Sequence, residues 1–194
     1  EEKLVKYLDI PIQHCNGDIL RRMNRQGDAG TLAALLNKIR QMIPDITLRT
    51  TLITGFPGET EAQFTELAEF IQAQRFDRLG CFAYSQEEGT RAAEFPDQVP
   101  EDVRQHRADI LMEQQQLIVE EKNNARLGQV CTAVIEGYDR WAECWFGRTA
   151  ADAPDIDGKV FIRSETPLHI GDYVTVRLDE VLDYDFVGEV VTDE

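Results

Sequence analysis

The chain has 194 residues, of which 42% are hydrophobic and 29% charged, enough for one medium domain or two small ones with a buried core. Its 36 acidic against 20 basic residues give a net charge of −16, and such a surface repels a phosphate backbone, so the chain as a whole is a poor nucleic-acid binder. No apolar run approaches the ~20 residues of a membrane helix, which excludes a membrane span.

The first residues, Glu1-Glu2-Lys3, include neither a signal peptide nor an initiator methionine, so we expect part of a longer protein. Four cysteines, Cys15, Cys81, Cys131 and Cys144, are separated by 66, 50 and 13 positions. None of these is a CxxC-type spacing, so the chain alone predicts no zinc or iron–sulfur site. Isolated cysteines are typical of free thiols in a reducing compartment, and we expect a cytoplasmic protein.

The first two thirds of the chain alternate between short apolar runs and helical patterns. We expect strands at 4–10, 47–54 and 78–84, and helices at 17–24, 31–42, from about 60, and at 101–126. Thr60 and Gln63 have the spacing of a capping box, which specifies one helix start. Strict alternation predicts an α/β fold with a parallel sheet, and three strands are too few for a closed barrel of about eight. We therefore expect a partial TIM-like barrel.

After Gly128 the pattern changes to five short strands separated by glycines and prolines. They are expected at 129–136, 141–147, 158–162, 173–179 and 186–191. This pattern favours a small all-β, OB-like barrel, with a domain boundary at Leu127 that gives domains 1–127 and 128–194. The second domain has 5 basic and 15 acidic residues, net −10, and the first has 15 and 21, net −6.

Three loops follow the three predicted strands and meet at the edge where parallel α/β folds bind ligands. In the turn from Gly55 to Gly58, two glycines permit close approach of a ligand, although spacing alone favours an ordinary strand–helix turn. After the first strand, Gln13 is a candidate for hydrogen bonding. His14 and Cys15 are adjacent, so we expect one in the core and one at the surface and no nucleophile pair.

Several charged and aromatic groups have both a functional and a structural interpretation. Arg21, Arg22 and Arg25 either bind a carboxylate or form a solvated helix face, with Asp18 spaced to pair with Arg21 and Arg22. Arg49, inside a strand, either extends to solvent at the barrel end or reaches a carboxylate in the site. The glutamates at 87–88 and the helix 101–126 are expected to be solvated, the helix as a connector. Aromatics of the second domain form either a base-stacking platform, which the acidic charge opposes, or core: Tyr138, Trp141, Trp145, Phe146 and Tyr184.

Three ordered motifs give the chain a specific resemblance to the methylthiotransferase family of radical S-adenosylmethionine enzymes. They are YLDIPIQH at 7–14, MNR at 23–25 and TGFPGET at 54–60, which resemble the latter half of that family's catalytic barrel. Residues 128–194 resemble its C-terminal TRAM domain. LRTT at 48–51, YSQEEGT at 84–90 and GRTAADAPDIDG at 147–158 are similar to the branch that modifies a ribosomal protein, as distinct from the tRNA-modifying branch.

The resemblance implies methylthiolation of the β-carbon of an aspartate in ribosomal protein S twelve. It also implies S-adenosylmethionine and two [4Fe–4S] clusters, one that forms a 5′-deoxyadenosyl radical and one that delivers sulfur. The acidic second domain agrees with a basic protein substrate, and we expect no tRNA partner, no membrane and a monomer. The alternatives are a tRNA adenosine methylthiotransferase and a non-catalytic adaptor for basic proteins.

The N-terminal cluster domain and the CxxxCxxC loop of the family are absent from this sequence, so we expect the chain alone to be inactive, with no catalytic or metal-ligating residue. The resemblance places six residues at S-adenosylmethionine or substrate, with the glycine turn flanking the adenine. They are Gln13, Arg25, Arg49, Thr51, Gly55 and Gly58.

Overall fold

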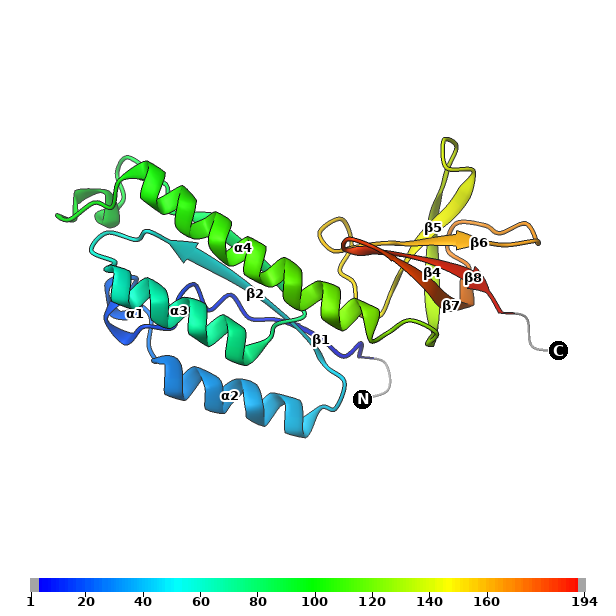
Figure 1. Cartoon of the computed structure of the whole chain (residues 1–194), viewed down its shortest axis with the longest axis horizontal. Coiled ribbons are helices and arrows are strands. Elements are labelled where there is room, and N and C mark those ends of the chain that lie inside the picture. The colour runs from blue at the N-terminus through cyan, green and yellow to red at the C-terminus, as the bar shows by residue number, and fades with distance from the viewer. Residues whose placement is uncertain (1–3, 192–194) are drawn as a thin grey trace. The chain divides into compact units, whose positions relative to one another are not determined.

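The structure, a computed structural model, describes residues 4–191 (Figure 1). Its backbone divides into two compact units: residues 8–118, called here the α/β unit, and residues 1–7 with 119–194, called the barrel unit. The division falls inside α4, and each unit has its own hydrophobic cluster. The first elements are β1 (Tyr7–Asp9), α1 (Gly17–Arg22), α2 (Ala29–Met42), β2 (Thr47–Thr54), α3 (Glu61–Gln74), β3 (Arg78–Ala83), the 3-10 turn η1 (Arg91–Glu94) and α4 (Glu101–Asn124).

The α/β unit is built on a three-stranded sheet in the order β1-β2-β3. The pairing of β2 with β3 is parallel, as the alternation of strands and helices predicts, and runs from Arg49 opposite Arg78 to Thr54 opposite Ala83. Beyond β1, the chain stays beside β2 through a parallel bridge between Gln13 and Leu52. The first strand is shorter than the expected span of 4–10.

Capping side chains set the helix starts. Thr60 and Gln63 form the predicted capping box at α3, each side chain bonded to the other residue's backbone N–H. The second helix begins at Ala29, two residues earlier than expected, because Asp28 caps it and exchanges hydrogen bonds with Thr31.

One face of β2 carries the core of the α/β unit. Leu48 and Leu52 are fully buried there, in one cluster with side chains from α2, α3 and α4, which run beside the sheet in Figure 1. Arg49, Thr51 and Ile53 alternate with them on the opposite face and are only half-buried. The helices therefore cover one face of the sheet and leave the other, with both polar and apolar side chains, uncovered.

The expectation that α4 is a solvated connector is wrong. Leu111 and Ile118 are buried in the main cluster, and Arg107 and Gln115 are buried as well, with the Gln115 amide donating to the Phe76 carbonyl at 2.9 Å. The apolar face of α4 is narrow and most of its other residues are charged or polar. The average composition of the helix therefore does not reveal the face that packs in the core.

The barrel unit confirms the prediction of a small five-stranded barrel. Its strands close in the order β4-β5-β6-β8-β7. They are β4 (Val130–Asp139), β5 (Cys144–Thr149), β6 (Val160–Arg163), β7 (Tyr173–Leu182) and β8 (Asp185–Val190). The strand expected to begin at Trp141 begins at Cys144 because the Asp139 carboxylate accepts from the N–H groups of Trp141 and Ala142 and holds them in a turn.

Close contact between strands of the barrel requires glycine at Gly147 and at Gly188, where a Cβ would overlap the Arg177 carbonyl. A Cβ on Gly147 would overlap the Val134 carbonyl of the neighbouring strand. Ala133, Ile135, Val176 and Phe186 are among the buried side chains that fill the interior.

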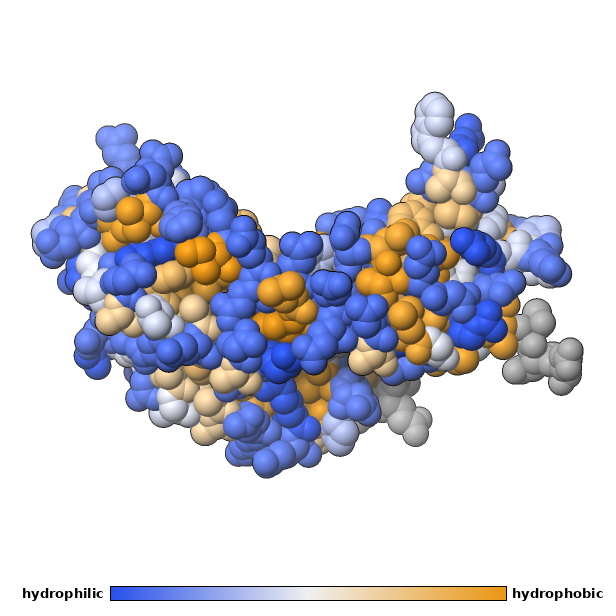
Figure 2. Space-filling model, viewed as in Figure 1, coloured by the Kyte–Doolittle hydropathy of each residue, from blue (hydrophilic) through white to orange (hydrophobic). Residues whose placement is uncertain are grey.

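Among residues 4–191, no helix combines the length and the apolar character that crossing a bilayer requires. The face shown in Figure 2 is mainly hydrophilic, with separate apolar patches.

Candidate functional site

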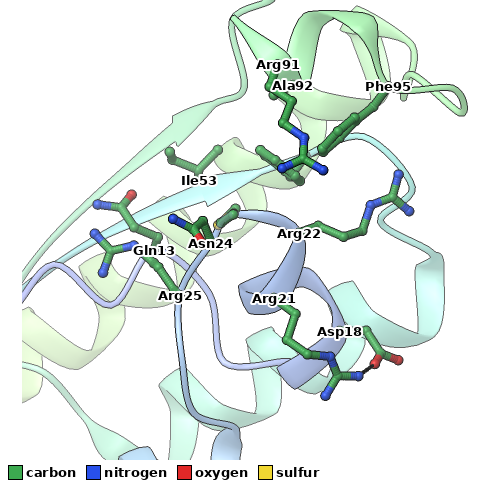
Figure 3. Close-up of a pocket in the computed structure, with 12 residues that line it drawn as sticks. Gln13, Asp18, Arg21, Arg22, Asn24, Arg25, Ile53, Arg91, Ala92 and Phe95 are labelled. Atoms are coloured by element: carbon green, nitrogen blue, oxygen red, sulfur yellow. Dashed lines mark hydrogen bonds and ion pairs between the residues drawn. The ribbon is translucent and has the colours of Figure 1, made fainter.

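A pocket of about 830 Å³ opens in the α/β unit at the carboxyl end of β2. Loops that follow all three strands contribute to it, as expected for a parallel α/β sheet. Four arginines line it, Arg21, Arg22, Arg25 and Arg91, and its apolar lining includes Ile53, Phe56 and Phe95 (Figure 3). Its size suits a small organic ligand.

Gln13 lies in this pocket with an unusual backbone. Its φ of +67° is in the left-handed region, yet its N–H donates to the Thr51 carbonyl and its carbonyl accepts from Ile53, both at 2.9 Å. The β2 backbone thus holds it on both sides. The side-chain atom Oε1 is buried and has no hydrogen-bond partner among the residues that the structure describes. A buried acceptor of this kind is suited to a ligand that brings a hydroxyl or amino donor.

The positive side chains of the pocket are held in different ways. Arg21 pairs with Asp18, one of the two pairings that their spacing predicts, and Arg25 donates to the Pro11 carbonyl at 3.0 Å. The guanidinium groups of Arg22 and Arg91 lie 5.4 and 5.9 Å from the centre of the Phe95 ring, within cation–π range. Phe95 itself packs edge-on against Phe56, with ring centres 6.2 Å apart.

The two glycines of the β2–α3 turn are required for packing. Both have positive φ, +69° at Gly55 and +81° at Gly58. A Cβ on Gly55 would overlap the side chain of Arg104, and a Cβ on Gly58 would overlap the guanidinium of Arg22. Neither glycine lines the main pocket; Gly58 lines a smaller recess of about 460 Å³, to which Arg22 also contributes.

Glu59 is the buried centre of this turn. Its carboxylate accepts from the Gly55 N–H at 2.9 Å and from Arg107 at 2.8 Å, and it lies 3.4 Å from Nε2 of His14. The Asn16 N–H donates to Nδ1 of His14 at 2.9 Å, so the ring proton resides on Nε2, facing the carboxylate. Glu59 therefore ties the β2–α3 turn to α4 and lies beside the loop that carries Gln13.

The structure contradicts the expectation for His14 and Cys15, because both are fully buried. The chain leaves extended geometry at Gln13, so alternation along a strand no longer assigns the next two side chains to opposite sides. The separate prediction that they form no nucleophile pair agrees with His14 facing Glu59 and with burial raising the pKa of the Cys15 thiol to about 12.

Arg49 and Thr51 lie on the polar face of β2, outside the lining of the pocket. Arg49 reaches a carboxylate, but one outside the pocket: its Nη1 bonds Asp9 at 2.7 Å, across to β1, so neither interpretation is met in full. Of the six predicted ligand-binding residues, Gln13 and Arg25 therefore share the pocket, two share the adjoining sheet face, and the two glycines support the turn.

The four cysteines are free thiols, as expected. Burial also raises the pKa of Cys81 to about 12. No group of three or more His, Cys, Asp or Glu side chains within residues 4–191 is arranged to hold a metal ion. The described residues therefore do not fit an iron–sulfur cluster by themselves.

Sequence reasoning missed Arg91, Phe95, Glu59 and Arg107 as parts of the site. The arginine at 91 and the ring at 95 stand in a long loop without periodicity, and only the fold brings them to Gln13. One available signal was Glu59 directly after Gly58, a carboxylate at the start of a helix.

The aromatics of the barrel unit have mixed environments. Tyr138 and Trp145 pack edge to face with centres 5.1 Å apart, and Lys159 lies 4.8 Å from the Phe146 ring. Trp141, in contrast, is 98% exposed.

Comparison with known proteins matches both units. A family described as "Radical SAM superfamily" matches residues 1–71, and one described as "TRAM domain" matches residues 127–191. A protein of Desulfitobacterium hafniense named "Ribosomal protein uS12 methylthiotransferase RimO" is 50% identical over 189 residues, which are 97% of this chain and 42% of that protein. The protein of the same name from Acetivibrio thermocellus is 44% identical over 99% of this chain and 42% of its own length.

The chain thus spans less than half the length of the curated relatives it matches. A solved structure, coproporphyrinogen III oxidase (HemN) from Escherichia coli, described as a radical SAM enzyme, covers 75% of this chain and 39% of that chain at 16% identity with a TM-score of 0.46. That similarity is too low to establish a common fold.

Proposed function

We infer that the chain belongs to the radical S-adenosylmethionine methylthiotransferases and forms part of an enzyme that adds a methylthio group to the β-carbon of an aspartate in ribosomal protein uS12. The observation that carries this proposal is the 44–50% identity to proteins of that name along nearly the whole chain. The chain supplies part of a catalytic barrel up to Leu127 and a TRAM domain from 128 onward. We expect the full protein to act as a cytoplasmic monomer.

The pocket fits S-adenosylmethionine on its polar and apolar groups. The unsatisfied Oε1 of Gln13 can accept from a ribose hydroxyl or an amino group, Ile53 and Phe56 offer apolar contact to the adenine, and Arg25 offers a donor to the carboxylate. When bound and reduced by an iron–sulfur cluster, this molecule supplies the radical that abstracts hydrogen from an unactivated carbon. Two [4Fe–4S] clusters are proposed for the full protein, held by residues other than those described here.

Residues around the pocket position Gln13, and they affect the ligand only through the position of the Gln13 side chain. His14 packs beside Glu59 on one side of the loop, and the β2 backbone holds the loop by hydrogen bonds on the other. Arg49, paired with Asp9, and Thr51 lie on the sheet face that would line the interior of a complete barrel. We propose that they form its polar wall.

The barrel unit is proposed to recognise the basic ribosomal protein by charge. Residues 128–194 have a net charge of −10, which attracts a lysine- and arginine-rich polypeptide and repels tRNA. Neutralising the exposed Glu165 and Glu180 to glutamine in the full protein should weaken binding of uS12 and reduce its dependence on salt. The matched control is Glu69→Gln, an exposed glutamate of α3 in the other unit.

The decisive experiment uses the full-length protein that contains this chain, reconstituted with iron, sulfide and S-adenosylmethionine. Mass spectrometry of a uS12 peptide that contains the target aspartate should show the gain of one CH₂S unit, located on that residue. A gain of mass on a tRNA adenosine instead would establish the tRNA-modifying alternative. Binding of uS12 without any modification would support the adaptor.

A further inference from the structure

The pocket concentrates positive charge in a chain whose net charge is −16. Four arginines line it against a single carboxylate, Asp18, which is paired with Arg21. Within residues 4–191, Arg22, Arg25 and Arg91 have no carboxylate within ion-pair distance. These three guanidinium groups gather around one pocket, and such a concentration of unneutralised positive charge in an acidic chain points to an anionic ligand.

The pocket has two ends, which Figure 3 separates clearly. Gln13 and Arg25 lie together at one end, where the Pro11 carbonyl orients Arg25. Arg22, Arg91 and Phe95 lie at the other end. The two ends can therefore bind two different ligands side by side.

The Phe95 end is preorganised. The Phe95 ring is fixed by Phe56, which also packs against Tyr84 with ring centres 5.3 Å apart. This ring orders the guanidinium groups of Arg22 and Arg91 in the free protein. Charged donors that are already ordered lose less entropy when an anion binds.

We propose that Arg22 and Arg91 at the Phe95 end receive the side-chain carboxylate of the acidic residue in the polypeptide substrate. This proposal rests on the proposed function. Arginine is suited to the role because its planar donors match a carboxylate. The β-carbon of an aspartate is bonded directly to its carboxyl carbon, so holding the carboxylate also positions the C–H bond that is to be broken.

A second source of a carboxylate is the amino-acid part of S-adenosylmethionine. The unsatisfied Gln13 Oε1 and the oriented Arg25 assign that cosubstrate to the opposite end, because they offer complementary partners for its donors and its carboxylate. The shared chemistry is a carboxylate on an arginine, and binding measured for each ligand separately distinguishes the two sources.

The test uses the full-length protein and the variants Arg22→Gln and Arg91→Gln, with Lys38→Gln on the exposed surface of α2 as a control for the loss of one positive charge. The probes are a uS12 peptide with its target aspartate, the same peptide with asparagine, and S-adenosylmethionine. Each variant should weaken binding of the aspartate peptide by about 10-fold and leave that of the asparagine peptide and of S-adenosylmethionine unchanged. Arg22→Lys and Arg91→Lys should restore part of the loss because they keep the charge.

Two results would overturn the proposal. In the first, the wild-type protein and the variants bind the aspartate peptide more tightly than the asparagine peptide by the same factor. In the second, the variants lose affinity only for S-adenosylmethionine, which would assign the arginines to the cosubstrate. Both results count only when the wild-type preparation used for the comparison adds the CH₂S unit to the aspartate peptide. A wild-type protein that adds no CH₂S unit contradicts the proposed function itself, and the proposal about these arginines with it.

Discussion

The sheet of the barrel unit closes on itself, whereas the sheet of the α/β unit is covered by helices on one face only. In the barrel, five strands pair in a ring around buried aliphatic side chains. In the α/β unit, the uncovered face of β2 presents Arg49, Thr51 and Ile53, and the pocket opens beside it. Closure pairs the strand edges of the barrel, and an open face provides room for chemistry at the cost of exposed polar backbone and side chains.

The largest expected effect tests where the stability of the α/β unit resides. Phe76 is completely buried in its main cluster, so Phe76→Ala should lower the free energy of unfolding of this unit by about 4 kcal/mol. Hydrogen exchange of the α3 and β2 amides measures the loss. Phe82→Ala is the control, because that ring is 61% exposed and its removal should cost well under about 1 kcal/mol. Equal effects would mean that the uncovered face is as well packed as the covered one.

The buried charge centre comes next. Glu59→Ala removes the buried partner of Arg107 and should cost about 3 kcal/mol, because the guanidinium is left buried with less compensation. Glu61→Ala removes the other carboxylate on the same arginine, but that side chain is 78% exposed and the change should cost about 0.5 kcal/mol. Urea denaturation compares the two variants. A similar loss in both would show that Glu59 does not hold the loops together.

Two Gly→Ala substitutions at positive φ separate the cost of backbone strain from the cost of steric overlap between the new Cβ and a neighbouring side chain. Gly55→Ala should cost about 2 kcal/mol, since φ is +69° and the new Cβ would overlap Cβ and Cγ of Arg104, next to the α4 backbone. Gly89→Ala, at φ +80° with no atom within 4 Å of the added Cβ, carries the strain alone and should cost about 1 kcal/mol. Thermal denaturation gives both values. The difference between them reports the space that Arg104 occupies.

In the barrel unit, the loss of one buried hydroxyl, which donates to Asp152 and accepts from the Ala151 N–H at 3.2 Å, should matter less. Thr149→Val removes the hydroxyl that donates to Asp152 at 2.6 Å, and should cost about 1 kcal/mol. Thr132→Val, at an exposed position of β4, should be neutral or slightly stabilising, because valine favours strands. Hydrogen exchange of the β4 and β5 amides measures the stability of each variant. A neutral Thr149→Val would show that closure alone holds the barrel.

The smallest effect concerns pH. Burial raises the pKa of Cys15 to about 12, whereas the thiol of the unfolded chain keeps its usual value near 9.0. The folded state therefore binds more protons above pH 9, so this contribution to stability is complete at neutral pH and is lost as pH rises from 9 toward 12. Between pH 7 and pH 9 the loss should stay below about 1 kcal/mol, and Cys15→Ala should reduce it. An identical pH profile in the variant would contradict the burial of the thiol.

Local signals predicted much of the fold. The β-branched run at 47–54 and the Thr60–Gln63 spacing specify β2 and the start of α3, and the spaced short strands specify a five-stranded barrel. These features depend on neighbours in the chain. The burial of α4 depends on contacts with distant strands, so its composition suggested a solvated helix.

The site was less predictable than the fold, for a physical reason. Gln13 and Arg25 stand in motifs, whereas Arg91 and Phe95 come to the same pocket from a loop with no repeating pattern. The contact of Arg49 with Asp9 joins positions 40 residues apart. Spacing in sequence carries no information on such pairs until the sheet order is known.

The positive φ of Gln13 restricts which sequences a laboratory could evolve at this site. Valine, isoleucine and threonine, which suit the adjoining strands, are disfavoured in that backbone conformation, whereas asparagine and glycine tolerate it. A randomised library at position 13 should therefore yield folded members mainly with flexible or amide side chains. Redesign of ligand preference would then have to change residues opposite Gln13, since few amino-acid types are tolerated at position 13 itself.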